Sequence, residues 1–213
     1  MSRTRAVALL VATRNPGKLR EIRTLLPECG GDIIGLDAYP GLVLPPEADT
    51  TFVENAVMKV SAAARLTGLP AVADDSGLEV DVLGGYPGVR SAIFAGEHAG
   101  DGANNQLLLD LLMDVPDERR TARFVCAIAW GKPGQQPKVT VAYCHGRVLR
   151  VPRGTHGFGY DPLFYYPPAG LTFGELSPAA KNAVSHRALA LQAARPGIMG
   201  MLDDNPGVVR ENR

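Results

Sequence analysis

Apolar residues along this chain follow two patterns, continuous runs and a helical spacing of three or four. The first run, Ala6 to Ala12, is unbroken and is typical of a buried central strand. Apolar positions then recur at helical spacing from Leu19 to Leu26, behind an asparagine that is a favourable N-cap and a proline at the first helical position. Ile33 and Ile34 indicate a second strand. The chain therefore begins as strand, helix, strand.

The next segment repeats the alternation. A proline-rich loop from Tyr39 to Asp49 leads to the capping box of Thr51 and Glu54, which predicts a helix that ends near Gly68. Strand-like runs follow on both sides of an acidic break, at residues 69–73 and 78–83, and a glycine-rich turn comes after them at residues 84–90. Another helix is expected to start at Asp101 or Gly102.

The C-terminal half adds strands and two short helices. Two segments of β-type composition, Arg123–Trp130 and Val139–Val151, predict a long hairpin across the 131–138 loop. Residues 154–168 are rich in glycine, proline and aromatics, which indicates a functional loop. Ser177 precedes a short helical turn, and Ser185 is a second N-cap for a helix from His186 to about Ala194. Helices that alternate with strands predict an α/β fold, and no composition shift divides residues 1–213 into separate domains.

Composition narrows the function classes. The 22 basic and 22 acidic residues balance, which argues against a dedicated binder of nucleic acid or of a membrane surface. The three cysteines, Cys29, Cys126 and Cys144, are far apart and odd in number, so neither a disulfide framework nor a structural zinc site is expected. No segment has the length of a membrane span. These features predict a soluble protein of the reducing cytoplasm.

The most informative polar feature is the pair Asp74-Asp75, followed by Ser76-Gly77. Neighbouring side chains in a regular strand point to opposite faces, but a break in the strand at Ser-Gly lets both acids face one cleft. Adjacent carboxylates repel each other unless a cation or a shared proton relieves the repulsion. A hard divalent metal that activates water explains the pair. A polar turn between two strands is the alternative.

Three other groups of residues have candidate chemistry. The strand-loop-helix at residues 13–18 offers a helix N-terminus beside Lys18, which suits a phosphate, although it lacks P-loop spacing. In residues 157–162, glycines around Phe158 suit the stacking of a flat ligand. Lys181 and the pair His186-Arg187 converge only if a new helix starts at Ser185. A capped surface helix, a tight turn and structural side chains are the alternative readings.

Two charged residues, Glu47 and Lys59, are candidate site residues only in combination with the other motifs. Glu47 lies in a loop before the capping box, from which it can reach a metal, and Lys59 projects from the helix that follows. Alone, both read as solvated surface charges. Together, the groups describe phosphate donors, an acidic metal centre, an aromatic platform and a basic end. That combination suits a nucleoside triphosphate.

With these motifs in order, the chain resembles the inosine/xanthosine triphosphate pyrophosphatase family from Val7 to about Leu191. The family hydrolyses deaminated purine nucleoside triphosphates to monophosphate and pyrophosphate. The resemblance implies an elongated mixed sheet flanked by helices, two lobes with a cleft between them, and a homodimer. The matching blocks are Thr13-Arg14-Asn15-Pro16-Gly17-Lys18, Thr51-Phe52-Val53-Glu54-Asn55-Ala56, Ala73-Asp74-Asp75-Ser76-Gly77-Leu78, Pro87-Gly88-Val89-Arg90-Ser91-Ala92, Gly157-Phe158-Gly159-Tyr160-Asp161-Pro162 and Lys181-Asn182-Ala183-Val184-Ser185-His186-Arg187.

The resemblance also implies roles for matching positions. Asp75 is the general base and a Mg²⁺ ligand, and Glu47 and Asp74 assist the metal. Phe158 stacks on the purine. The implied substrate contacts are Thr13, Arg14, Asn15, Pro16, Gly17, Lys18, Lys59 and Ser76 at the triphosphate, and Phe158, Gly159, Tyr160, Asp161, Lys181, His186 and Arg187 at the nucleoside.

Two other functions stay open at this point. One is a related pyrophosphatase for pyrimidine or modified triphosphates. The other is a regulator that binds a triphosphate without hydrolysing it, against which the costly acid cluster argues. A dinucleotide-binding dehydrogenase is disfavoured because its glycine fingerprint after a strand is missing.

Overall fold

The computed structural model describes residues 8–27, 32–47 and 50–203. Within them, a mixed sheet of seven strands has the order β2-β1-β3-β4-β5-β6-β7. The first three strands in that order are parallel and the remaining neighbours are antiparallel. The strands are Leu9–Val11 (β1), Ile33–Gly35 (β2), Ala71–Val80 (β3), Thr121–Gly131 (β4), Lys138–Val148 (β5), Phe164–Tyr166 (β6) and Leu171–Thr172 (β7).

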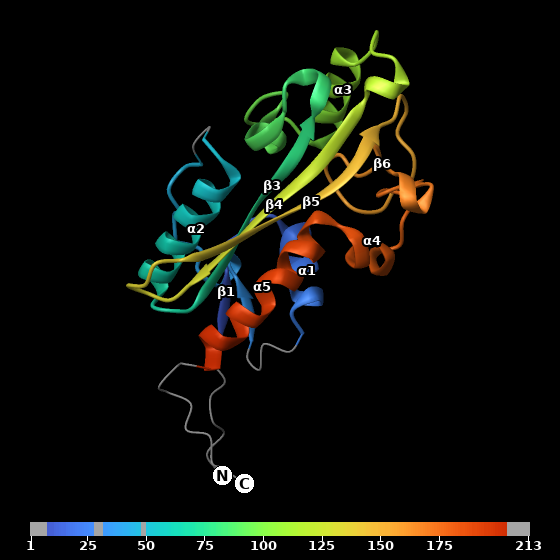
Figure 1. Ribbon diagram of the computed structural model, residues 1–213. Coiled ribbons are helices and arrows are strands. Elements are labelled where there is room, and N and C mark those ends of the chain that lie inside the picture. The colour runs from blue at the N-terminus through green and yellow to red at the C-terminus, as the bar shows by residue number, and fades with distance from the viewer. Residues whose placement is uncertain (1–7, 28–31, 48–49, 204–213) are drawn as a thin grey trace.

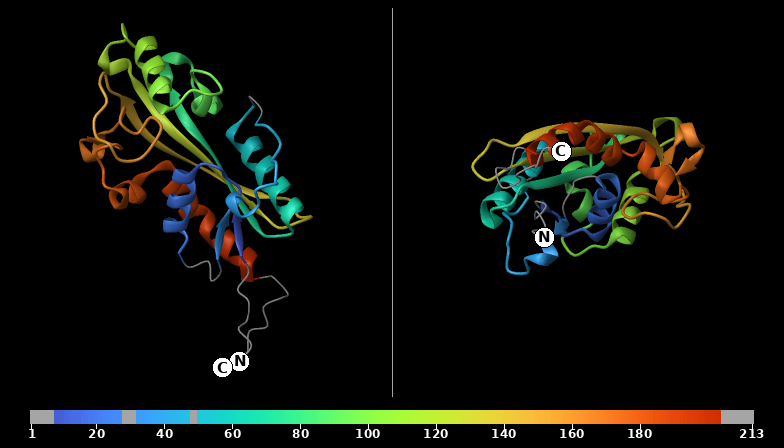
Figure 2. Two further views of the ribbon diagram at one scale, coloured as in Figure 1. Left: turned by 180° about the vertical axis from the view of Figure 1, so that it is seen from behind. Right: turned by 90° about the horizontal axis from the view of Figure 1, so that it is seen from below.

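Helices cover both faces of the sheet, and the molecule is elongated along its three long strands (Figure 1). Helix α2 packs on one face, whereas α1 and α5 pack on the other (Figure 2). Helix α3 lies beside the C-terminal end of β3 (Figure 1). A third apolar cluster there packs residues of α3, β3, β4 and β6 together. The helices are Pro16–Leu25 (α1), Phe52–Thr67 (α2), Asp101–Leu111 (α3), Pro178–Val184 (α4) and His186–Asp203 (α5). This confirms the predicted α/β class with an elongated mixed sheet.

Local sequence signals set most helix ends. The Asn15 side chain accepts from the amides of Gly17 and Lys18, and the Thr51 hydroxyl accepts from the amide of Glu54. Helix α2 ends as predicted at Gly68, whose φ of 72° suits a residue without a side chain. These contacts satisfy amide and carbonyl groups that helix ends leave unpaired.

Three expectations are corrected. Helix α5 continues past Ala194 and through Pro196, because Ile198 and Leu202 bury against the sheet. The second hairpin strand ends at Val148, before the predicted Val151. The third correction concerns the acidic break and is described with the site.

Some sequence predictions fall outside the described residues. Cys29, Asp49 and the first two positions of the predicted first strand are among them. Cys126 and Cys144 are buried free thiols, as expected.

Candidate active site

Strand β3 runs unbroken through the acid pair, so the predicted break is wrong. Asp74 pairs with Ile128 of β4 and Asp75 with Ala127, and the register continues through Gly77 to Val80. The two aspartates therefore point to opposite faces of the sheet. Strand β1 pairs with β3 only as far as Val72, so the acids begin where one edge of β3 loses its neighbour.

Asp74 faces the side of α1 and α5 and is fully engaged there. Its Oδ1 contacts Lys18 Nζ at 2.5 Å and accepts from the Ser76 hydroxyl at 3.1 Å. Its Oδ2 accepts from Arg187 Nε and from the Cys126 thiol, both at 3.0 Å. Burial alone would raise the pKa of Asp74, but the charges of Arg187 and Lys18 outweigh burial and hold the pKa well below its usual value. Asp74 is a buried anion that organises two cations.

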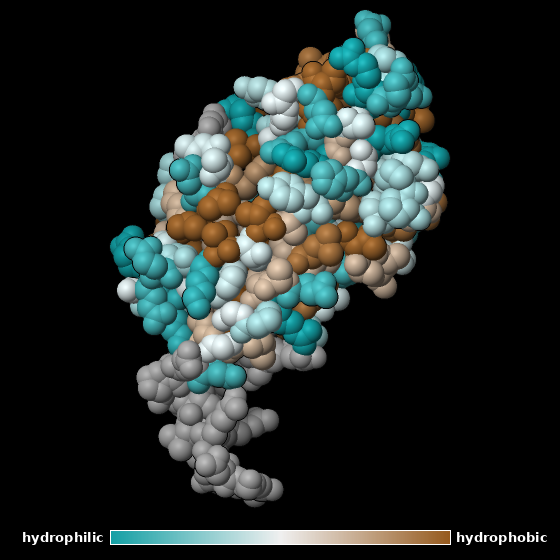
Figure 3. Space-filling model, viewed as in Figure 1, coloured by the Kyte–Doolittle hydropathy of each residue, from teal (hydrophilic) through white to brown (hydrophobic). Residues whose placement is uncertain are grey.

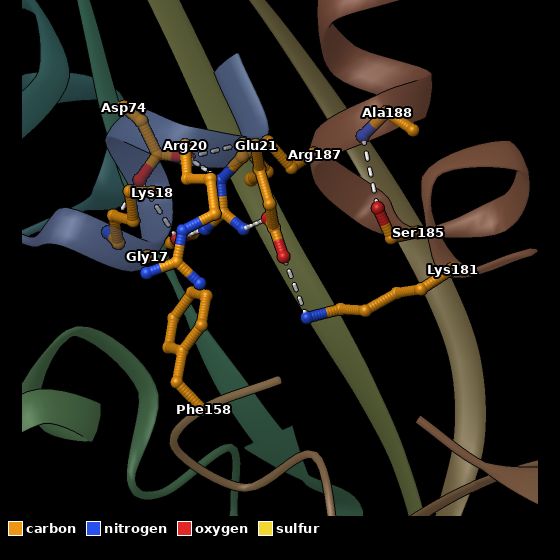
Figure 4. Close-up of polar contacts among 12 residues, drawn as sticks. Gly17, Lys18, Arg20, Glu21, Asp74, Phe158, Lys181, Ser185, Arg187 and Ala188 are labelled. Atoms are coloured by element: carbon orange, nitrogen blue, oxygen red, sulfur yellow. Dashed lines mark hydrogen bonds and ion pairs between the residues drawn. The ribbon is translucent and has the colours of Figure 1, made fainter. Parts of the chain in front are cut away.

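Glu21 of α1 completes this charged cluster and was missed by the sequence analysis. Its carboxylate pairs with Arg187 Nη1 and accepts from Lys181 Nζ at 2.9 Å, and it lies between these two side chains in Figure 4. Burial opposes ionisation of Glu21, but the two cations outweigh it and lower the pKa. The available signal was its spacing of three from Lys18, which places both on one helix face. Without the fold, Glu21 reads as a solvated charge.

The glycine-rich loop brings Phe158 to the same cluster. Its ring centroid lies 4.9 Å from Lys181 Nζ and 5.6 Å from Arg187 Cζ, which are cation–π distances. A Cβ added to Gly17 would meet the ring at 2.7 Å, so the ring lies directly against α1. Lys181 also pairs with Asp161 at 2.6 Å. Burial raises the pKa of Asp161 more than Lys181 lowers it.

His186 lies at the start of α5, directly after its N-cap Ser185, whose hydroxyl accepts from the amide of Ala188. The imidazole stacks on Phe124 with centroids 4.6 Å apart. Burial lowers the pKa of His186 well below its usual value, and the charges of Arg187 and Lys181 lower it further. The ring is therefore neutral, and its Nδ1 has no hydrogen-bond partner among the described residues.

The opposite face of β3 holds a second charged group. Lys59 Nζ of α2 donates to Asp75 Oδ1 at 2.7 Å and to Glu47 Oε1 at 2.9 Å. Asp75 Oδ2 is buried and has no hydrogen-bond partner within the described part of the chain. Burial raises the pKa of Asp75, and the nearby charges of Lys59 and Lys18 only partly offset it. Lys59 thus contacts both Glu47 and Asp75, the two acids that the sequence analysis assigned to the metal.

The start of α1 is occupied by its own cap. Pro16 has no amide proton, and the amides of Gly17 and Lys18 both donate to Asn15 Oδ1. The predicted supply of free amides at this helix N-terminus is therefore absent from this structure, and the side chains provide the charge. Arg14 Nη2 donates to the carbonyl of Leu42 at 2.6 Å, which ties the loop before Glu47 to this segment.

The two charged groups lie at two adjoining hollows. The hollow on the Phe158 side and the hollow on the Asp75 side share the walls formed by Asn15, Lys18, Ser76 and Ala92. The first is also lined by Gly159, Tyr160, Asp161, Lys181, His186 and Arg187, and the second by Thr13, Arg14, Glu47 and Lys59. Of the predicted substrate contacts, only Pro16 and Gly17 line neither.

The comparison with known families decides the identity of this fold. A family profile described as the Ham1 family matches residues 9–196. The chain belongs to the Ham1 family. A dITP/XTP pyrophosphatase of Geobacter sulfurreducens is 52% identical over 183 residues, which cover 86% of this chain and 92% of that protein. A dITP/XTP pyrophosphatase of Desulforamulus reducens is 49% identical over 186 residues, with 87% and 92% covered.

Solved Ham1 structures have the same architecture. The Staphylococcus aureus Ham1 protein superimposes with a TM-score of 0.80 at 36% identity, covering 91% of this chain and 98% of that one. The family resemblance inferred from the motifs is thus confirmed. Across the described residues of this Ham1 chain, no group of three or more His, Cys, Asp or Glu side chains is placed to hold a metal. Likewise, none of its described helices has the length and apolarity that a membrane crossing needs.

Proposed function

We propose that this protein hydrolyses ITP, dITP and XTP to the nucleoside monophosphate and pyrophosphate, removing deaminated purines from the nucleotide pool. The observation that carries the proposal is the pair of adjoining hollows with shared walls, one with an aromatic ring and cations and the other with lysines and a carboxylate pair, which one triphosphate would span. The relatives named dITP/XTP pyrophosphatase support the substrate class.

The Glu47–Asp75 pair fits Mg²⁺. Magnesium is commonly held by one or two carboxylates together with substrate phosphates, so a third protein acid is not required. The carboxylates of Asp75 and of the exposed Glu47 supply hard oxygen donors of this kind. When bound there, the ion would neutralise phosphate charge and acidify water.

Asp75 acts as the general base in this proposal. Lys59 holds its Oδ1, which leaves Oδ2 to take a proton from the water that attacks the α-phosphorus. As the bond to the leaving oxygen breaks, Lys59 and Lys18 face the charge that develops on pyrophosphate. The other proposed triphosphate contacts are Thr13, Arg14, Asn15 and Ser76, which line these hollows, whereas Pro16 and Gly17 line neither and shape the turn before α1.

The hollow beside Phe158 binds and selects the base in this proposal. Phe158 stacks on the purine, and Arg187 or Lys181 donates to a 6-oxo group, whereas a 6-amino group would place donor against donor. Because His186 is neutral, it offers one donor and one acceptor nitrogen. Gly159, Tyr160 and Asp161 complete the lining at this end.

Asp74 has a different role from the metal pair. Both its oxygens already have two partners each, on the face away from Glu47 and Asp75. We assign it to holding Lys18, at the phosphate end, and Arg187, at the base end, in fixed positions. This replaces the expectation that Asp74 assists the metal.

A substrate panel tests the proposed function. Purified protein with Mg²⁺ is expected to release pyrophosphate rapidly from ITP, dITP and XTP and slowly from ATP, GTP and pyrimidine triphosphates. The phosphate species are identified by ion chromatography. Free orthophosphate as first product would contradict attack at the α-phosphorus. Preference for a pyrimidine or modified triphosphate would favour the related pyrophosphatase, and tight binding without product would favour the sensor.

We further propose a cytoplasmic homodimer, as the family resemblance implies. Several large apolar side chains are partly exposed, among them Val139 and Tyr143 on β5, which are 38% and 45% exposed. The face in Figure 3 shows hydrophobic side chains near its middle, interrupted by polar ones. Sedimentation equilibrium is expected to give twice the 22.6 kDa chain mass, and a monomer at micromolar concentration would refute the dimer.

A further inference from the structure

Helix α3 holds both backbone polar groups of Gly159, the residue that follows Phe158. The amide of Gly159 donates to Asp101 Oδ2 at 2.6 Å, and the carbonyl of Gly159 accepts from Asn105 Nδ2 at 3.0 Å. Asp101 and Asn105 are four residues apart, so they lie on one face of α3 at its first turns. The two side chains grip Gly159 from opposite ends of the residue.

This grip, the two hydrogen bonds from Asp101 and Asn105 to Gly159, joins helix α3 to the loop that contains Phe158. Asn104 anchors α3, because its Oδ1 accepts from the amide of Ala95 at 2.8 Å and its Nδ2 donates to the carbonyl of Ala92 at 3.1 Å. The following residue of the loop, Tyr160, is also tied, since its hydroxyl donates to the carbonyl of Ser91 at 2.9 Å. The loop is therefore fixed from the α3 side at the residues directly after Phe158.

Two features of these contacts, an unpaired buried oxygen and a left-handed glycine, are typical of functional sites. Asn105 Oδ1 is buried without a hydrogen-bond partner among the described residues. Native structures rarely leave a buried acceptor unpaired, and the exceptions concentrate at functional sites. Gly159 itself has a φ of +61°, a conformation that side-chain-bearing residues avoid. Asp101, Asn104 and Phe158 line the same hollow.

We propose that Asp101 and Asn105 are positioning residues that hold the Phe158 ring over the base end of the site by fixing the Gly159 peptide. The inference rests on the proposed function, because it assigns the ring to base stacking. With the grip released, the Phe158 amide keeps its hydrogen bond to Asp161 at 2.9 Å and the ring keeps its contacts with Lys181 and Arg187, but the backbone of Gly159 loses its hydrogen bonds to α3. Base binding then weakens, while the Asp75 end, on the other face of β3, keeps its geometry.

The test compares Asp101→Ala and Asn105→Ala with the wild type. Each is expected to raise KM for ITP roughly tenfold, the effect of losing about one hydrogen bond, with kcat within about threefold. Asp101→Asn keeps an acceptor oxygen and should stay close to wild type. Gln106→Ala is the matched control, because Gln106 pairs with Asp110 at the same spacing of four on α3 without contacting the loop.

A double-mutant cycle separates positioning from general stability. If Asp101 acts through the ring, Asp101→Ala should add little to KM in a Phe158→Ala background. Full additivity of the two effects, or equal KM in Asp101→Ala and wild type, would overturn the proposal. A loss of kcat matching the rise in KM would overturn it as well, since the grip would then serve the catalytic end.

Hydrogen exchange of the peptide that contains Gly159 provides a readout independent of turnover. Asp101→Ala is expected to speed exchange of the Gly159 amide, and Gln106→Ala to leave it unchanged. Unchanged exchange in Asp101→Ala would show that the grip does not hold the loop. If the wild type hydrolyses no triphosphate, the proposed function fails and with it the stacking role, whereas faster exchange would still establish the grip.

Discussion

Asp75→Asn is expected to reduce kcat for ITP by at least about 10³-fold while nucleotide binding changes little. General-base catalysis alone contributes about 10²–10⁴-fold, and Asp75 in addition forms half of the carboxylate pair that fits Mg²⁺. Asparagine preserves the size of the side chain but has no basic oxygen. Pyrophosphate release measures kcat, and calorimetric titration with ITP measures the dissociation constant.

The design needs a control that changes an aspartate without touching the site. Asp81→Asn suits this purpose, because Asp81 follows β3 directly and its carboxylate accepts from the exposed Thr121 hydroxyl at 2.6 Å. It should keep the wild-type rate. An Asp75→Asn protein that retained near-wild-type turnover would assign the base to another residue, and one that lost nucleotide binding equally would make Asp75 a binding residue.

The sequence predicted those parts of the fold that local signals control. The caps at Asn15, Thr51, Ser177 and Ser185 are side-chain contacts across two or three residues, so they can be recognised without the fold. The long hairpin of β4 and β5 was likewise visible in its composition. The ends of β5 and α5 were misplaced, because packing against distant residues decides where these elements stop.

The pair Asp74-Asp75 shows why the geometry of the site could not be predicted from the sequence. Ser76-Gly77 suggested a break, yet both residues pair with Cys126 and Val125 of β4, and this tertiary pairing overrides the local preference. Gly77 fits the strand for a different reason, since a Cβ there would meet the Ser91 hydroxyl at 2.4 Å. Strand continuity places Asp74 and Asp75 on opposite faces, which the motif alone does not reveal.

The charged partners of the motif residues could be predicted only in part. Lys59, Glu47 and Asp75 were grouped through the family resemblance, and the structure brings them into contact. Their spacing along the chain gives no such indication, because the contact joins a loop, a helix and a strand. Glu21 was missed for the same reason, since its partners lie about 160 residues away.

Asp74→Asn is expected to lower the free energy of unfolding by about 3–5 kcal/mol, the usual cost of removing one partner from a buried ion pair. The carboxylate is fully buried and faces two cations, of which Arg187 is almost inaccessible to water. Asparagine keeps the volume and an acceptor oxygen but leaves Lys18 and Arg187 with less compensation. Urea denaturation at pH 7 measures the change, and an effect below about 1 kcal/mol would contradict the role of Asp74 as their shared counter-ion.

Glu79→Gln is the matched control for charge on the same strand. Glu79 pairs with Arg123 at 2.6 Å, but the arginine side chain is 43% exposed, so the loss should stay below about 1 kcal/mol.

The pH dependence of the stability difference between wild type and Asp74→Asn adds a second criterion. Because folding lowers the pKa of Asp74, its contribution is complete above the unfolded value of about 3.9 and is lost as the pH falls through the folded value. The difference between wild type and Asp74→Asn should therefore be constant from pH 7 to about 5 and shrink below 4, and a difference unchanged at pH 3 would mean that asparagine destabilises the protein through packing instead of charge.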